Sequence, residues 1–462
     1  MSLRSLFTAR DMTLGSPWKR IAEFAVPMLI GNIAQQLYNT ADSIIVGIYV
    51  GDNALSAVGS ASPILNLLLA LFVGISTGAG VVISQAYGAR DREALSRNVG
   101  NCISMTVIAS LVIMLFGPLI TMPMLRLLDT PASIIDWCAD YLNIYFLGII
   151  GFFMYNMLSG VLRGLGDSLS ALGFLLVAAA LNVGLDILFV AKFHMGVPGV
   201  ALATVIAQAI SAVFCCWKLL KMRVHFDLNF KTLRIVPSTA MNIIRIGVPS
   251  GLTQAIMAMA MMVVQSLTNK MGEMVIACMV IIMRVDGFAM MPNFSFGQAM
   301  SVYSGQNTGA AQYDRVHTGT KHGTLLAVGT STLLTIGILL FGRSLISLFT
   351  DTEELIDLAT SMMRVMAVGY IAVSVTQVLG GVMRGAGDTV TPMWVSIIST
   401  IILRVPAAYL IAYLTAGEAW PKGSPYALSG SLLFSWTLGM VIQVIAYKKG
   451  NWKKKMYAAE YK

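Results

Sequence analysis

The sequence predicts an all-α polytopic membrane protein, with twelve transmembrane helices in two pseudo-symmetric six-helix lobes. Only 11% of its 462 residues are charged and 56% are hydrophobic, whereas charged residues make up near a quarter of a soluble protein. Apolar runs of about twenty residues, the length that crosses a bilayer, recur along the chain. One half of the chain also repeats the other. These observations exclude a water-soluble enzyme of ordinary design.

Each predicted span is an apolar run bounded by polar or turn-forming residues. The spans begin near residues 20, 52, 95, 133, 168, 197, 240, 273, 320, 358, 390 and 428. They divide the chain into a cytoplasmic N-terminal segment (1–18), a first lobe (19–217), a cytoplasmic linker (218–239), a second lobe (240–447) and a basic cytoplasmic tail (448–462).

The distribution of basic residues predicts the orientation in the membrane. With a cytoplasmic N-terminus, 22 of the 31 lysines and arginines fall in inside segments and only 5 in outside segments. This bias indicates an even number of spans with both termini in the cytoplasm. The net charge of +9 is therefore a topology signal, and no nucleic-acid partner is expected.

The internal repeat is clearest in two short segments that contain Arg-Gly-x-Gly-Asp. Residues 160–167 and 381–388 are identical at six of eight positions, at a shift of 221 residues, and Pro27 matches Pro249 at a shift of 222. Because six spans are an even number, the second half enters the membrane in the same orientation as the first. Such parallel repeats are typical of transporters that work by alternating access.

The two Arg-Gly-x-Gly-Asp segments predict tight cytoplasmic turns after spans 4 and 10. No strand precedes them and no Walker-type lysine follows, so dinucleotide and P-loop interpretations fail. The glycines permit a tight turn, and Arg163 can pair with Asp167. Because no ATP site is found, we expect an ion gradient to supply the energy, with no cofactor.

A polar stripe interrupts the first span. Asn32, Gln35, Asn39 and Asp42 follow a 3, 4, 3 spacing, which puts all four on one helix face. Amides alone can serve interhelical hydrogen bonds. An acid at membrane depth is costly and favours a functional role.

A second polar group lies in spans 5 and 6. Asn182 and Asp186 are one helical turn apart, and Thr204 follows in the next span. At about 1.5 Å per residue, Asp42 lies about 13 Å from its outer helix end, while Asp186 and Thr204 lie about 9 Å from theirs. These oxygens can bind a hard cation such as sodium. Two adjacent carboxylates can equally bind a proton.

The second lobe serves as an internal control. The repeat pairs Asn32 with Gln254, Gln35 with Met257 and Asn39 with Met261, while Asp42 and Asp186 correspond to Val264 and Ala407. Acids needed only for lobe assembly would be present in both halves, so a site-specific role is favoured. The polar break of the second lobe is Arg284 with Asp286, interpreted either as a buried ion pair or as a second coupling or substrate site. Arg404 is a further candidate for a buried cation.

The ordered set of motifs resembles the multidrug and toxic compound extrusion (MATE) transporters. It comprises Pro27, the segment 39–47, the segment 51–59, the loop 85–89, both Arg-Gly-x-Gly-Asp turns and the pair Asn182 and Asp186. The resemblance implies export of cationic, amphipathic compounds in exchange for sodium or protons, with a cation site on Asp42, Asn182, Asp186 and Thr204. Spans 7 and 10 carry Gln254 and Gln377 where many sodium-coupled members have acids, so the closest branch is that of the DNA-damage-inducible F proteins.

We therefore expect a multidrug efflux antiporter of the cell membrane. Its candidate coupling residues are Asp42, Asn182, Asp186 and Thr204, which are also the possible sodium ligands. Its candidate substrate-lining residues are Asn32, Gln35, Asn39, Gln254, Met257, Met261, Arg284, Asp286 and Gln377. The alternative is a flippase for a lipid-linked oligosaccharide from the same superfamily. No catalytic constellation indicates an enzyme. We expect a monomer that contacts only the lipid bilayer and its small-molecule substrates.

Overall fold

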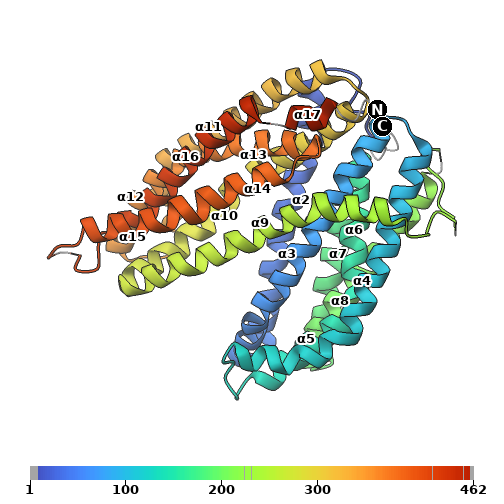
Figure 1. The fold of residues 1–462 in the computed structure, drawn as a ribbon. Helices are drawn as coiled ribbons and strands as arrows, with labels where there is room; N and C mark the ends of the chain where they lie inside the picture. The colour runs from blue at the N-terminus through green and yellow to red at the C-terminus, as the bar shows by residue number, and fades with distance from the viewer. Residues whose placement is uncertain (1–8, 223, 230, 419, 451, 458–462) are drawn as a thin grey trace. The chain divides into compact units, whose positions relative to one another are not determined.

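The computed structural model describes residues 9–222, 224–229, 231–418, 420–450 and 452–457. All regular elements in these residues are helices (Figure 1). The predicted N-terminal segment and basic tail lie partly outside the described residues.

The helices of the first half of the chain follow one another with short connections. They are α2 (Pro17–Tyr49), α3 (Asp52–Gly88), α4 (Arg92–Leu127), α5 (Ile135–Leu147), α6 (Ile149–Gly164), α7 (Ser168–Asp186), the π-helix η1 (Ile187–Lys192) and α8 (Gly196–Lys221).

The second half repeats this order. Its helices are α9 (Pro237–Lys270), α10 (Glu273–Gly309), α11 (Tyr313–Ile346), α12 (Glu353–Ala367), α13 (Gly369–Gly385), α14 (Val390–Ile397), the π-helix η2 (Ile398–Arg404), α15 (Val405–Leu414), α16 (Tyr426–Lys449) and the short α17 (Trp452–Tyr457).

The all-α fold agrees with the prediction, but several spans are not single straight helices. In the described residues, nine helices are long and apolar enough to cross a membrane, and two bent pairs bring the number to eleven. The pairs are α5 with α6, bent by 54°, and α12 with α13, bent by 40°. Helix α2 is 33 residues long but is absent from this set, because its polar stripe lowers its hydropathy.

The residues form two compact units whose boundaries differ from the predicted lobe boundaries. Unit 1 comprises residues 1–11 and 30–251, and unit 2 comprises residues 12–29 and 252–462. The boundaries therefore cut α2 and α9 within their length, close after Pro27 and Pro249. Unit 2 contains the first part of α2, and unit 1 contains the first part of α9. The remainder of each helix belongs to the other unit.

The repeated turns have the same backbone in both units. Gly166 and Gly387 have φ values of 87° and 88°, a left-handed conformation that favours glycine. The expected pairing of Arg163 with Asp167 is wrong. Arg163 donates to Ser159 Oγ at 2.8 Å, whereas Asp167 caps α7 by accepting from Ser170 N at 2.9 Å and pairs with Lys218 at 3.3 Å. The cap satisfies a free N–H at the helix start.

The segment between α8 and α9 packs on α4 within unit 1. Arg92 donates to both carboxylate oxygens of Asp227, at 3.1 and 2.8 Å, and this hydrogen bonding lowers the pKa of Asp227. The backbone of Asp227 donates to Ser96 Oγ at 2.8 Å, and that of Val236 donates to Asn101 Oδ1 at 2.8 Å. The predicted linker is thus a packed part of this unit.

Small residues allow two helices of unit 1 to meet backbone to backbone. Gly74 and Gly78 on α3 face Gly251 and Gly247 on α9, and a Cβ at either α3 position would meet α9 backbone atoms. Both pairs have the small-xxx-small spacing that permits close approach of membrane helices. This contact attaches the first part of α9 to unit 1.

Replacing Gly78 with Ala should destabilise the protein by about 1–3 kcal/mol, the usual cost of overpacking. The added methyl group would lie about 2.5 Å from the Gly247 backbone, which cannot move aside as a flexible side chain can. Thermal unfolding of the purified protein in detergent measures the effect. The matched control is Gly59→Ala on the same helix, where nothing lies within 4 Å of the new Cβ. Equal unfolding midpoints for the two variants would contradict the close contact.

Candidate functional site

The polar stripe of α2 lines a cavity inside unit 1. Gln35, Asn39 and Asp42 all border this cavity, which has a volume of about 360 Å³. Gln35 Nε2 donates to Asn39 Oδ1 at 3.3 Å, so the two amides are held along the wall. Asn32, the fourth member of the stripe, is not among the lining residues. The predicted helix face is therefore polar because it borders this cavity.

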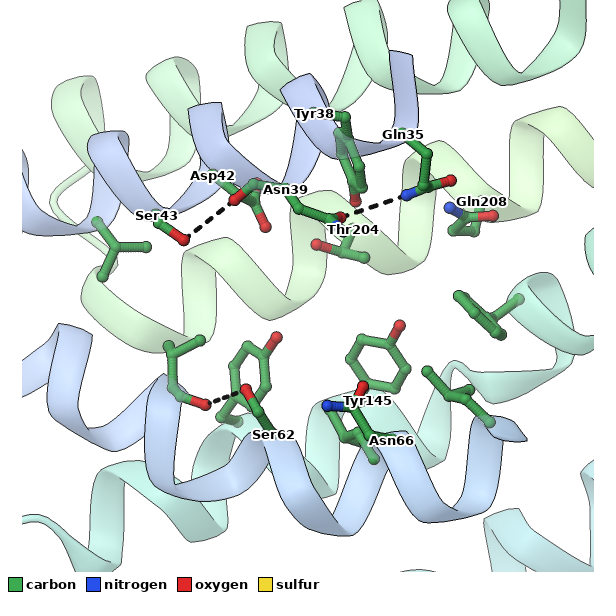
Figure 2. Close-up of a pocket in the computed structure, with 16 residues that line it drawn as sticks. Gln35, Tyr38, Asn39, Asp42, Ser43, Ser62, Asn66, Tyr145, Thr204 and Gln208 are labelled. Carbon is green, nitrogen blue, oxygen red and sulfur yellow. Dashed lines mark hydrogen bonds between the residues drawn. The ribbon is translucent and has the colours of Figure 1, made fainter. Parts of the chain in front are cut away.

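The other walls come from α3, α5, α6 and α8. Figure 2 shows Gln35, Tyr38, Asn39 and Asp42 along one side and Ser62, Asn66 and Tyr145 along the other. The remaining lining residues are Ser43, Val46, Val58, Leu65, Leu69, Tyr141, Phe152, Thr204 and Gln208. Among the lining residues that the structure describes, Asp42 is the one carboxylic acid and none is basic. Its field is therefore negative, which favours a cation.

Behind Asp42 lies a buried polar cluster that contains the three other predicted coupling residues. Asn182 and Asp186, on α7, have no exposed surface, and Thr204 on α8 is 6% exposed. With its amide oriented so that all groups find partners, Asn182 donates to Asp42 Oδ1 at 2.8 Å and to Asp186 Oδ2 at 3.0 Å. Its oxygen accepts from Thr204 N at 3.2 Å and Oγ1 at 3.3 Å. One amide group thus joins both carboxyl groups.

Two features make this cluster unusual for a purely structural network. Asp186 Oδ1 is buried and has no hydrogen-bond donor among the described residues, and a buried acceptor without a partner is costly. Helix α7 also changes to the π-helix η1 directly after Asp186. Single π turns within helices occur frequently at functional sites. A proton or cation bound by Asp186 would give the unpaired oxygen a partner.

Sequence reasoning missed the aromatic side chains of the cavity. Tyr38, Tyr141 and Tyr145 line it, and the Tyr38 hydroxyl interacts with Thr204 of the cluster. Tyrosine is common in apolar spans, so its presence carried no signal by itself. The sequence pattern could have indicated Tyr38, because this residue lies three residues after Gln35 and four before Asp42, on the polar face.

The predicted second-lobe residues do not gather in the same way. Gln254, Met261 and Arg284 are exposed, and Met257 is half-buried. Gln377 packs against Gly297 of α10. None of them lines the cavity of Figure 2. The structure gives unit 2 no counterpart built from this set.

Of the two interpretations of Arg284 and Asp286, the buried ion pair is contradicted by the structure, while the second coupling or substrate site stays a prediction. Residues two apart lie on different sides of a helix, and Arg284 is exposed while Asp286 is half-buried. Asp286 lies close to Tyr370 and Arg404 instead. In the described part of the chain, Asp286 Oδ1, Tyr370 Oη and Arg404 Nε are all buried without a hydrogen-bond partner. Asp286 therefore has a cation nearby, whereas the described contacts of Asp42 and Asp186 are with an amide.

The match to a known protein family falls on each half of the internal repeat. The MatE family model matches the chain twice, at residues 27–188 and 249–410. The chain is 29% identical to the probable multidrug resistance protein YoeA of Bacillus subtilis over 451 residues, which is 95% of each chain. It is also 29% identical to the probable multidrug resistance protein YpnP of the same organism, over 96% of this chain and 98% of that one.

Solved structures share the fold over nearly the full length. A structure described as the outward-facing conformation of a multidrug resistance MATE family transporter superposes with a TM-score of 0.88 and 21% identity, covering 98% of this chain and 99% of that one. A transporter of the MOP superfamily from Pyrococcus furiosus gives a TM-score of 0.86 at 22% identity, covering 97% and 98%. At these identities the likeness concerns the fold.

Asn182→Leu should lower the free energy of unfolding, because it removes the amide donor that the carboxyl groups of Asp42 and the buried Asp186 share. A buried acceptor left without its partner costs about 1–3 kcal/mol, and here two acceptors are affected. Thermal unfolding in detergent is the measurement. Asn66→Leu is the matched control, because Asn66 faces the cavity from α3 and is exposed. A loss of stability no greater than that of the control would argue against the shared amide.

Proposed function

The chain belongs to the MatE family, whose members are transporters and not enzymes, and we propose that it exports cationic or amphipathic organic compounds in exchange for protons. It is a multi-pass protein of the cell membrane. The relatives described above carry names that refer to multidrug resistance. The chemistry of the unit 1 cavity supports the same substrate class for this chain.

The cavity suits an organic cation. Tyr38, Tyr141 and Tyr145 lie around the same space as the Asp42 carboxyl group. Aromatic faces attract cations electrostatically, and most strongly where water is displaced. The amides Gln35 and Asn39 supply hydrogen bonds that adapt to different ligands. An acidic cavity is unsuited to the anionic phosphates of a lipid-linked saccharide, which disfavours the flippase alternative.

The observation that carries the proposal is that Asp42 belongs to both the cavity and the buried cluster. It lines the cavity and accepts the Asn182 amide that also reaches Asp186. A proton taken up by the pair Asp42 and Asp186 removes the negative charge that attracts a cationic substrate. Substrate and proton therefore compete, and this negative coupling is reciprocal. Competition at one site, combined with alternating access, produces exchange.

In the orientation that gives every group of its amide a hydrogen-bond partner, Asn182 favours a proton over sodium. Its NH₂ group faces both carboxyl groups and its oxygen faces Thr204. A sodium ion needs oxygen ligands, so the amide would have to rotate before its oxygen could contribute. A shared proton needs no such rotation, because it can join one carboxyl group to its neighbour. We propose Asp42 and Asp186 as the proton carriers, with Asn182 and Thr204 as positioning residues.

Further parts of the proposal rest on the sequence pattern. The tandem repeat, with Pro27 and Pro249 at equivalent positions inside α2 and α9, supports alternating access. The basic-residue bias supports cytoplasmic termini. Asn32 and the second-lobe residues Gln254, Met257, Met261, Asp286 and Gln377 stay candidates for contact with substrate in other stages of the cycle. We expect the monomer to be the working unit.

Asp42→Asn should reduce drug export to the level of liposomes without protein, since the amide can neither release a proton nor attract a cation. The measurement is efflux of a fluorescent cationic dye from proteoliposomes under an imposed proton gradient. Asp136→Asn serves as the control, because Asp136 is an exposed acid in the first turn of α5. Wild-type export by the Asp42 variant would refute the assignment.

The coupling ion is tested by separating the gradients. Dye efflux by the wild-type protein should follow a proton gradient imposed without sodium and should not respond to a sodium gradient at constant pH. Efflux driven by sodium alone would contradict the proton assignment while leaving the transport function intact. Failure of both gradients to drive efflux would contradict the antiport proposal itself.

A further inference from the structure

A second cavity lies in unit 2, between α11 and α16, and the proposed transport site does not use it. It has a volume of about 510 Å³. Its lining residues are polar toward one end and apolar toward the other, and they comprise His317, Thr320, Lys321, Thr324, Leu325, Val328 and Tyr447. Leu325 is 71% exposed, so the cavity is a groove on the side of the unit.

One end of the groove is basic and aromatic. Lys321 follows His317 by one turn of α11, and Lys453 of α17 acts electrostatically on His317, as do Lys321 and the acid Asp314. The Trp452 ring lies 6.3 Å from that of His317 and 4.9 Å from that of Tyr447. Tyrosine and tryptophan are enriched where membrane proteins cross the lipid headgroups. This end is thus suited to an anionic headgroup.

The length of the groove matches one leaflet of a bilayer. From His317 to Val328 the helix advances about 16 Å, at about 1.5 Å per residue. The hydrocarbon core of a bilayer is about 30 Å thick, so the groove extends across about half of it. An acyl chain that starts at the basic end would lie along Thr324, Leu325 and Val328.

The equivalent face of unit 1 is covered by the chain itself. The repeat shift of 221 pairs His317 with Ser96, Lys321 with Gly100 and Leu325 with Ser104. There, the backbone of Asp227 donates to Ser96 Oγ at 2.8 Å, Ser104 Oγ donates to Leu233 O, and Thr232 O lies against Gly100. This face of α4 is therefore covered by the segment between α8 and α9, and Asp227 lies at one end of it.

Unit 2 replaces these features with a basic, open groove. Lysine and histidine stand where unit 1 has glycine and serine, so a peptide cannot approach α11 as closely as it approaches α4. Among the described residues, α17 reaches the end at His317 and Tyr447, while the groove continues over Thr324, Leu325 and Val328. The covering molecule must bring an anionic group for the basic end and an apolar chain for the remainder.

We propose that this groove binds an anionic phospholipid, with its phosphate beside His317, Lys321 and Lys453 and one acyl chain along Thr324, Leu325 and Val328. Basic pockets at the end of membrane helices are suited to such headgroups. The acyl chain takes the place that Thr232 and Leu233 occupy on α4 of unit 1. The proposal is independent of the transport cycle and of the cavity that contains Asp42.

Native mass spectrometry of the full chain tests the proposal by counting retained lipids. The purified protein is offered equal amounts of phosphatidylglycerol and phosphatidylcholine with identical acyl chains. The wild-type protein should retain one phosphatidylglycerol in preference. The double variant Lys321→Glu/Lys453→Glu should lose at least about tenfold in affinity for it, because each lysine near an anionic headgroup contributes several-fold.

Control variants separate the site from general effects of charge and folding. Lys270→Glu/Lys422→Glu makes the same change of charge at two exposed residues away from the groove and should retain the lipid. Thr324→Trp fills the apolar part and should lower retention without any change of charge. Unfolding midpoints measured without added lipid identify any variant that fails to fold, and Lys321→Gln then replaces the double variant, with a smaller loss of affinity expected.

Three results would overturn the proposal. One is equal retention of phosphatidylglycerol by the wild-type protein and by a folded Lys321→Glu/Lys453→Glu variant. Another is equal retention of phosphatidylcholine and phosphatidylglycerol by the wild-type protein. The third is full displacement of the lipid by glycerol phosphate at the same concentration, which would identify a phosphate site without a role for the acyl chain.

Discussion

The structure of unit 1 depends on the cost of placing two carboxyl groups inside a membrane protein without a basic partner. Asp42 and Asp186 are brought together by α2 and α7, and the described residues that line the cavity beside them include no lysine, arginine or histidine. The donor that they share in the described structure is the amide group of Asn182. Isolated charges in a low-dielectric interior are unfavourable, and the proposed exchange of a proton between the pair and the cavity relieves this cost. The architecture of the unit keeps this pair both buried and reachable.

The two units place different neighbours beside the acids of their membrane helices. In unit 2, Asp286 lies near Arg404, at the end of the π-helix η2. In unit 1, the π-helix η1 follows Asp186 and brings no cation to it. Arg404 places a positive charge near Asp286, whereas Asn182 places a neutral amide beside the acids of unit 1. Duplicated halves have thus acquired different electrostatic roles on one fold.

Sequence patterns predicted the helices and most of the first-lobe site, because membrane burial leaves strong signals. Long apolar runs mark spans, and a polar face on α2 is too costly to occur by chance. The bend at Gly148 left no such signal, since it depends on Val205 packing where a Cβ would lie. The tyrosines of the cavity were missed because their residue type is ordinary in a span. The ion-pair interpretation of Arg284 and Asp286 failed because residues two apart in a helix lie on different sides of it.

The segment between α8 and α9 has the composition of a flexible tether, yet Asp227, Leu233 and Val236 are hydrogen-bonded to α4. Insertions are tolerated where backbone is exposed and free of such bonds. A protease site or a fluorescent protein inserted between residues 227 and 236 would therefore disrupt the packing of this segment on α4. The segment that separates the two halves in the sequence is therefore a folded part of unit 1.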